Sequence, residues 1–285
     1  MRQIILLSFS IVTLVSIYII SRHDSTSSEE VCLFPQIYSI NEVQDQLNQA
    51  DDSTFVFFDC DDTLISAQDY LPRHFVMPTL FRVLAALKHR RLIYDRAYGE
   101  KVFSLMLEKA PRFLIEPAVT KAINKLYKQG AHVLAITGME TGSFGNIKSM
   151  PEWRANMLKE FGVNLSNEFK DTTFDNLKPY RNNYPVLHSG LICCNQRFKS
   201  EVIMTFFDHF KLKPETIILF DDSHEELVSL QEECNKRSIT ALCYHYKAAS
   251  QIKHQPWSTW QALKQLDYLL EHEQWISDDA IRAQT

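Results

Sequence analysis

The sequence predicts an α/β protein built on a doubly wound parallel sheet, with a small helical insert. The first observation is a set of three apolar runs without polar alternation, at residues 55–58, 132–136 and 216–220. Such runs are typical of strands that are buried on both faces. The second observation is that stretches with helical periodicity separate these runs, as in sheets connected by right-handed crossovers. At 285 residues and 45% hydrophobic content, the chain is long enough for one core and a smaller insert.

Residues 1–23 differ from the rest of the chain and are interpreted as a signal peptide or membrane anchor. Arg2 precedes 17 residues without a charge, from Ile4 to Ile20, a length that spans only a thin bilayer. No small-residue cleavage site follows cleanly, so an uncleaved anchor is favoured, while a cleaved signal stays open. Either interpretation predicts a protein exported across the membrane or anchored in it, periplasmic or secreted, with its bulk outside the cytoplasm. Residues 24–53 are interpreted as a linker and entry segment.

The net charge and the cysteine spacing argue against some classes of binding partner and some kinds of metal or redox site. The net charge of -5 and the pI near 6.1 argue against a general binder of nucleic acid or of anionic membranes. Membrane contact is expected through residues 4–20 if this segment is not cleaved. The six cysteines include no CxxC pair, which gives little support to zinc or dithiol chemistry. Export would permit disulfides, but buried free thiols are the favoured interpretation.

The first apolar run leads directly into the carboxylates of Asp59, Asp61 and Asp62. Carboxylates crowded at the end of a strand repel one another unless a cation compensates them, so they predict a Mg2+ site. An acidic turn without a ligand is the alternative interpretation.

A helical insert is predicted at residues 65–112. It begins with a polar loop at 65–71 and contains helical patterns at 80–87 and 98–109. The insert separates the two parts of the predicted core, residues 54–64 and 113–285.

The second apolar run follows a helix predicted between Glu116 and Gly130. It ends at Thr137, which places a hydroxyl at the carboxyl end of a strand. A mobile or tightly turning loop is predicted next, because three glycines follow within eight residues: Gly138, Gly142 and Gly145. The next predicted elements are a helix at 153–161 and a hairpin or edge strand at 185–194, with no element assigned at 169–183.

The third apolar run ends at Asp221 and Asp222 and follows a helix predicted from Lys199 to Phe210. Ser223 and Glu226, three positions apart, predict a capping box for the next helix. The last predicted elements are a strand at 239–244 and a C-terminal helix that packs on the core, with Trp257 and Trp260 as core or cover residues.

Polar residues therefore follow three separate strands of the predicted sheet. In doubly wound sheets, ligands bind at the carboxyl ends of the strands. The side chains expected to meet there are those of Asp59, Asp61, Thr137, Asp221 and Asp222. Together they predict one site more strongly than any of them does alone.

These motifs resemble those of the haloacid dehalogenase superfamily of phosphotransferases over about residues 54–245. The superfamily's first motif, an apolar strand followed by Asp-x-Asp-x-Thr, is similar to Asp59-Cys60-Asp61-Asp62-Thr63-Leu64. Its second motif, a strand ending in Thr or Ser, is similar to the strand that ends at Thr137. Its third motif, a Lys near the start of a helix, is similar to Lys199. Its fourth motif, an apolar strand ending in an acidic pair, is similar to the strand that ends at Asp221-Asp222. The residue after the second aspartate of the first motif is often Gly, and here it is Asp62. The C-terminal part and the long second spacing resemble an uncharacterised bacterial branch of the superfamily.

The resemblance implies a Mg2+-dependent phosphatase that hydrolyses phosphate monoesters through an aspartyl-phosphate intermediate. Asp59 would be the nucleophile, and Asp61 the general acid and base. Asp59, the backbone carbonyl of Asp61, and Asp221 or Asp222 would hold Mg2+. Thr137, the Gly138 amide and Lys199 would bind the phosphoryl group, with Lys178 and Arg197 as competitors for the role of Lys199.

The helical insert resembles a cap that controls substrate access in relatives and favours small, soluble phosphate esters. Arg73, His74, Arg82 and Tyr94 are candidates for contacting such a substrate. Two alternatives to the phosphatase stay open. One is a non-catalytic or regulatory binding module on the same fold, and the other is a phosphotransferase or phosphomutase.

Overall fold

The computed structural model describes residues 34–73, 89, 91–253 and 258–284. The predicted signal or anchor at residues 1–23 and the helix predicted at 80–87 lie outside this part of the chain, as do Cys32, His74, Arg82 and Trp257. No helix in the described ranges is long and apolar enough to cross a membrane. The five cysteines that the structure describes are free and buried, which confirms the prediction of buried thiols for those five.

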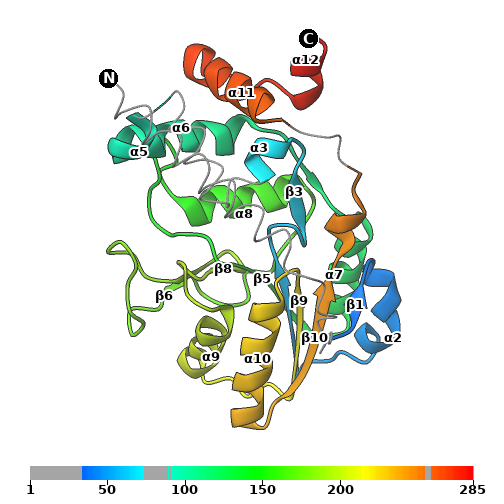
Figure 1. Cartoon of the computed structure of the whole chain (residues 1–285). Helices are drawn as coiled ribbons and strands as arrows, with labels where there is room; N and C mark the ends of the chain where they lie inside the picture. The colour runs from blue at the N-terminus through cyan, green and yellow to red at the C-terminus, as the bar shows by residue number, and fades with distance from the viewer. Residues whose placement is uncertain (1–33, 74–88, 90, 254–257, 285) are drawn as a thin grey trace, which may run out of the picture. The chain divides into compact units, whose positions relative to one another are not determined.

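Eight of the described strands form one large sheet in the order β1-β10-β9-β2-β5-β8-β7-β6 (Figure 1). In this order, each strand from β1 through β10, β9, β2 and β5 to β8 is parallel to the next one. β7 then pairs antiparallel with β8, and β6 pairs antiparallel with β7. Phe57 pairs with Leu134 and with Leu219, so the three apolar runs lie side by side. The strand bounds are β1 Gln36–Ile37, β2 Thr54–Asp59, β5 His132–Thr137, β6 Thr172–Thr173, β7 Val186–His188, β8 Leu191–Cys193, β9 Thr216–Asp221 and β10 Thr240–Tyr246.

Alternate residues of β2 enter two separate apolar cores, which explains why residues 55–58 of this strand are all apolar. Phe55 and Phe57 pack in the core that contains Phe206 and Phe207 of α9 and the apolar face of α10. Val56 and Phe58 face the other core, to which α7 and α8 contribute. Helices therefore cover both faces, and the doubly wound fold class is confirmed. The helix bounds are α7 Ala118–Lys128, α8 Met150–Glu160, α9 Lys199–Phe210 and α10 His224–Arg237.

The start of α10 differs from its predicted capping box. Ser223 is the N-cap residue, but its side chain makes no capping hydrogen bond. The Glu226 carboxylate instead accepts a hydrogen bond of 2.9 Å from the backbone N of Lys199, the first residue of α9. The residue before Lys199 is Phe198, which has no side-chain acceptor for the free amides of that helix end. The prediction of a capping box is therefore wrong, because Glu226 serves the neighbouring helix.

The entry segment contains three short elements that the sequence analysis does not predict: β1, η1 (Ile40–Val43) and α2 (Gln44–Leu47). β1 is held at the sheet edge by parallel pairing with β10. Glu116 ties the following turn to the core by accepting hydrogen bonds from the backbone N of Ile40 and from the Tyr246 hydroxyl.

The insert begins and ends in a two-stranded antiparallel sheet, so the polar loop predicted at 65–71 is wrong. Its strands are β3 (Ile65–Ala67) and β4 (Arg112–Leu114), which pair over their full length. The helices between them that the structure describes are α3 Tyr70–Arg73, α5 Arg91–Tyr94 and α6 Arg96–Lys109. α6 corresponds to the helix predicted at 98–109.

The C-terminal helix α11 (Thr259–His272) packs on the insert, and the prediction that it packs on the sheet core is wrong. Ala262, Leu266 and Leu269 share an apolar cluster with Val102 and Met106 of α6. This contact buries the apolar face of α6 that carries Val102 and Met106. Trp260 is 46% exposed, and the Lys264 ammonium lies 3.9 Å from its ring centroid, so Trp260 is a cover residue rather than a core residue.

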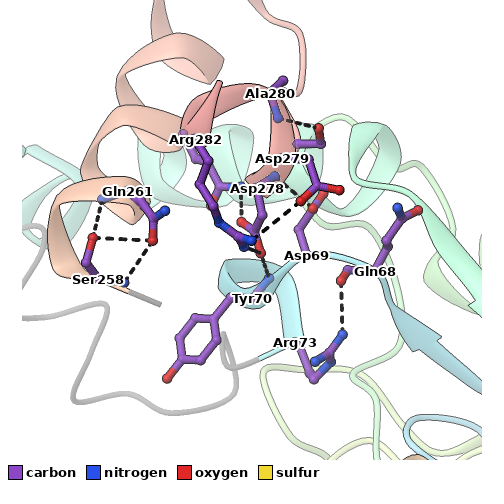
Figure 2. A network of polar contacts seen from close by, with 12 residues as sticks. Gln68, Asp69, Tyr70, Arg73, Ser258, Gln261, Asp278, Asp279, Ala280 and Arg282 are labelled. Carbon is purple, nitrogen blue, oxygen red and sulfur yellow. Dashed lines mark hydrogen bonds and ion pairs between the residues drawn. The ribbon is translucent and has the colours of Figure 1, made fainter. Parts of the chain in front are cut away.

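A group of hydrogen bonds, here called the clasp, joins α12 (Asp278–Arg282) to the start of α3 (Figure 2). Asp69 accepts bonds from the Trp275 indole N–H at 2.7 Å and from the backbone N of Asp278 at 2.9 Å. In return, the Asp278 carboxylate accepts from the backbone N of Tyr70 at 2.9 Å and from the Gln265 amide at 2.7 Å. Each aspartate thus satisfies a free amide at the start of the other's helix.

Candidate active site

The central feature of the site is a buried lysine between two buried aspartates. Asp59 is the last residue of β2, and Asp221 is the last residue of the neighbouring strand β9. The Lys199 Nζ donates to Asp59 Oδ1 at 2.6 Å and to Asp221 Oδ2 at 2.5 Å. Asp59 and Lys199 are each 5% exposed, and Asp221 is fully buried. The structure therefore brings together three of the residues predicted from the sequence.

The two competitors for the role of Lys199 lie elsewhere. The Arg197 guanidinium forms an ion pair with Glu201 and donates to the backbone carbonyl of Lys178. Lys178 forms no ion pair with any residue that the structure describes, whereas Lys199 begins α9 and its side chain reaches the two strand ends.

Negative charge exceeds positive charge at this site. Burial raises the pKa of Asp59, with further increases from Asp221 and Asp222, while Lys199 opposes the rise. Burial alone would lower the pKa of Lys199, but the Asp59 and Asp221 carboxylates outweigh it and raise the pKa. The pKa of Asp222 rises to about 6, because burial and then the charges of Asp221 and Asp62 disfavour its ionised form. One ammonium thus faces three carboxylates.

The three carboxylates fit a small divalent cation. Oxygen atoms of Asp59, Asp221 and Asp222 lie within 4.8 Å of one another. Hard oxygen donors with surplus negative charge are the ligands that suit Mg2+. Lys199 occupies one oxygen of Asp59 and one of Asp221, which leaves the second oxygen of Asp59 for a metal. The Asp61 side chain is not a member of this group, and the predicted use of its backbone carbonyl as a ligand stays a prediction.

Asp61 instead points its carboxylate to a buried arginine. The Arg154 Nη1 donates to Asp61 Oδ1 at 2.7 Å, and the exposed fractions of the two side chains are 5% and 56%. A partly exposed carboxylate beside the Asp59 strand end is suited to exchanging protons with a bound substrate. The next residue, Asp62, has φ 56°, a left-handed conformation that glycine adopts most easily.

Thr137 is the last residue of β5, and Gly138 follows it directly. The Thr137 hydroxyl is buried and accepts from the backbone N of Met139 at 3.2 Å. The segment after β8 runs alongside, since the backbone N of Cys194 donates to Thr137 O and that of Gln196 donates to Gly138 O. A Cβ atom added to Gly138 meets no described atom within 4 Å, so space beside its backbone is open.

The glycine-rich loop after β5 turns tightly against the insert. Gly145 has φ 55°, and a Cβ atom there would lie 2.2 Å from the Glu100 carbonyl oxygen of α6. The Ser104 hydroxyl of the same helix accepts from the backbone N of Asn146 at 2.8 Å. Only glycine fits at this contact, which holds the insert beside the strand ends.

A pocket of about 250 Å3 opens between the Asp61 side chain and the insert. Its polar lining residues are Asp61, Asp62, Ser66, Arg73, Arg112, Glu140, Arg154 and Gln196. Arg73, a predicted substrate contact, lines this pocket but commits its Nη2 to the backbone carbonyls of Ala67 and Gln68. Tyr94, another predicted contact, is 82% exposed and is not among the lining residues.

Arg112 and Arg154 are not predicted from the sequence, and Glu226 is predicted only as part of a capping box. Arg154 had a detectable signal, because Met150, Arg154 and Leu158 recur at i, i+4 and i+8 and form one buried face of α8. An arginine on an apolar helix face predicts a buried charge that needs a partner. Arg112 follows Pro111 without any such pattern, and the role of Glu226 depends on a helix 27 residues away.

The comparison with protein families finds one match that covers most of the chain. The family model described as Protein of unknown function (DUF2608) matches residues 36–282.

Similar proteins occur in Rickettsia. An uncharacterized protein of Rickettsia bellii (strain RML369-C) is 27% identical over 146 residues, which are 50% of each chain. Uncharacterized protein RP295 of Rickettsia prowazekii (strain Madrid E) is 31% identical over 134 residues, 45% of each chain. Uncharacterized protein RP296 of the same organism is 21% identical over 248 residues, 85% of this chain and 87% of that protein. The chain spans about half the length of the first two relatives in these matches.

Among solved structures, the HAD family hydrolase t0658 from Salmonella enterica subsp. enterica serovar Typhi is similar with a TM-score of 0.32. Its sequence is 14% identical, and the match covers 73% of this chain and 72% of that one.

Proposed function

We propose that this chain, which belongs to the DUF2608 family, is a Mg2+-dependent phosphatase that hydrolyses small phosphate monoesters through an aspartyl-phosphate intermediate. The observation that carries the proposal is the Lys199 ammonium held between Asp59 and Asp221, with Asp222 completing a group of three carboxylates. Burying so much charge costs folding free energy, and such arrangements gather at catalytic sites.

The reaction proceeds in two displacements at phosphorus. A carboxylate oxygen of Asp59 attacks, the bond between phosphorus and the leaving oxygen breaks, and Asp61 donates its proton to that oxygen. Asp61, now ionised, then accepts a proton from a water molecule whose oxygen attacks the same phosphorus. The bond to Asp59 breaks, and inorganic phosphate leaves. Proton transfer by a positioned group contributes about 10^2- to 10^4-fold in rate.

The surrounding groups orient these two aspartates. The hydrogen bond from the Lys199 Nζ to Asp59 Oδ1 fixes the orientation of the Asp59 carboxylate. Thr137 and the Gly138 amide bind the phosphoryl oxygens beside the open space at Gly138. Mg2+ held by Asp59, Asp221 and Asp222 would stabilise negative charge on the phosphoryl group.

The test is hydrolysis of p-nitrophenyl phosphate and a panel of phosphorylated metabolites by the full chain. Activity is expected with Mg2+, and none is expected in EDTA or in Asp59→Asn. An acid-quenched reaction with 32P-labelled substrate should leave base-labile label on wild-type protein but not on Asp59→Asn.

The matched control is Asp208→Asn, which changes an exposed aspartate that pairs with Arg237 away from the site. It should retain wild-type rates. If wild type and Asp59→Asn were equally inactive across the whole panel, the phosphatase proposal would be refuted. Transfer of phosphate to added alcohols or sugars in preference to water would identify a phosphotransferase instead.

We also propose that the chain acts outside the cytoplasm, on the basis of the apolar segment at residues 4–20. A fusion of residues 1–33 to a reporter enzyme that is active only after export should be active in a bacterial host. Activity equal to that of a fusion lacking residues 1–23 would contradict export.

A further inference from the structure

Two arginines stand close together at the pocket beside Asp61. Arg112 and Arg154 both line this pocket, and both guanidinium groups lie against the ring of Trp153, at 5.4 Å and 5.3 Å from its centroid. Burial and the neighbouring charge of Arg154 lower the pKa of Arg112 to about 10. Two like charges are therefore held together in a partly desolvated volume.

The described acidic residues do not neutralise the positive charges of both Arg112 and Arg154. Arg154 forms one ion pair, with Asp61, and its Nε has no hydrogen-bond partner among the described residues. Arg112 donates to the neutral backbone carbonyl of Leu107 at 2.5 Å and forms no ion pair within the described ranges. A guanidinium group carries five N–H donors, so these two arginines retain donors for an anionic ligand.

The other acidic groups that line the pocket are already engaged. Glu140 forms an ion pair of 2.9 Å with Arg181, and Asp62 accepts from the Ser66 hydroxyl at 2.6 Å. Asp61 is thus the sole carboxylate in ion-pair contact with either arginine among the described residues. The arginine side of the pocket keeps a surplus of positive charge.

The pocket lies next to the phosphoryl site but is distinct from it. Its lining includes Asp61, the proposed proton donor to the leaving group, but not Asp59, Thr137 or Lys199. The group that extends into it from the phosphoryl site is therefore the leaving group of the substrate. The remaining lining is largely apolar and includes Leu107, Phe144 and Met150, which suits a short carbon body.

From this juxtaposition we propose that the substrate is a small phosphate monoester whose leaving group carries a second acidic group, bound by Arg112 and Arg154. The inference rests on the proposed phosphatase function and adds the chemical class of its substrate. Carboxylate and phosphate groups share the chemistry that a pair of guanidinium groups recognises.

The test compares matched pairs of substrates that differ only in the second acidic group. Phosphoglycolate is compared with 2-hydroxyethyl phosphate, and propane-1,3-diol bisphosphate with 3-hydroxypropyl phosphate. Wild type should prefer at least one acidic member by about 10- to 100-fold in kcat/KM, the range expected for hydrogen bonds to a charged group. The pair that shows the preference identifies a carboxylate or a phosphate as the second group.

In Arg112→Gln and Arg154→Gln, this preference should fall towards one, chiefly through a higher KM for the acidic substrate. Arg154→Lys should retain part of it because the charge remains. The measured quantity is the ratio of kcat/KM for the acidic and the neutral substrate, because Arg154 also contacts Asp61 and its replacement can lower both rates. Thermal melting checks that each variant folds. Arg237→Gln, which removes an arginine paired with Asp208 away from the pocket, should keep both the rate and the preference of wild type.

A wild-type ratio near one, with the neutral esters still hydrolysed, overturns this inference and leaves the phosphatase proposal intact. An unchanged preference in both glutamine variants also overturns it. If no ester is hydrolysed, the phosphatase proposal fails. Calorimetric titration then tests whether the pocket binds the acidic group. Phosphoglycolate should bind more tightly than 2-hydroxyethyl phosphate, and Arg112→Gln should lose this difference, if the pocket arginines bind an acidic group. Equal binding of the two compounds to wild type overturns the inference.

Discussion

Replacing Asp222 with Asn should stabilise the metal-free protein, although it removes a group from the site. The pKa of Asp222 rises from 3.8 to about 6 because the carboxyl is largely buried and faces Asp221 and Asp62. The folded protein therefore holds this proton more tightly than the unfolded chain, so stability falls as the pH rises from about 4 to about 6. Each pKa unit corresponds to about 1.4 kcal/mol, which gives a cost of up to about 3 kcal/mol above pH 6.

Urea unfolding in EDTA measures this cost. At pH 7.5, Asp222→Asn should be more stable than wild type by up to about 3 kcal/mol, and at pH 4 the difference should be much smaller. Mg2+ at 100 times its Kd for wild type should remove most of this difference, because it stabilises wild type by about 2.7 kcal/mol and the variant has lost one carboxylate ligand. If Asp222→Asn were less stable than wild type in EDTA at pH 7.5, the electrostatic reasoning for this site would be refuted.

Two further substitutions test the lysine and the clasp. Lys199→Met should lower the free energy of unfolding at pH 7.5 by about 3–5 kcal/mol, because it leaves Asp59 and Asp221 buried without their cation; a loss below about 1 kcal/mol in urea unfolding would contradict the ion-pair assignment. Asp69→Asn should weaken the attachment of α12 by about 1–3 kcal/mol and speed its release in limited proteolysis. The control Asp279→Asn, whose side chain is 86% exposed, should be cleaved at the wild-type rate, and equal cleavage of both variants would exclude a structural role for the clasp.

The central strands and the acidic ends of β2 and β9 could be predicted because their signals are local. Apolar residues fill both faces of β2, so Phe55 to Phe58 show no alternation, and the carboxylates begin where the strand ends. Parallel pairing then places neighbouring strand ends at one edge of the sheet. The meeting of Asp59 with Asp221 follows from these two facts.

The elements that could not be predicted depend on distant partners. β1 and β3 are two and three residues long, too short for a periodic pattern, and pairing with β10 and β4 stabilises them. Glu226 satisfies the local capping pattern, but a second helix end lies near enough to take its carboxylate. The periodicity of α11 shows that one of its faces is apolar. It does not show whether that face packs on the sheet core or on the insert.

The clasp also sets an order of events during synthesis. Asp278 follows Asp69 by 209 residues, and the last strand of the sheet, β10, ends at Tyr246, before α11 and α12 begin. A nascent chain can therefore complete its sheet while the apolar face of α6 is still uncovered. Closing so long a loop is slow compared with local pairing. We therefore expect the apolar face of α6 to stay accessible to chaperones and proteases until α11 covers it.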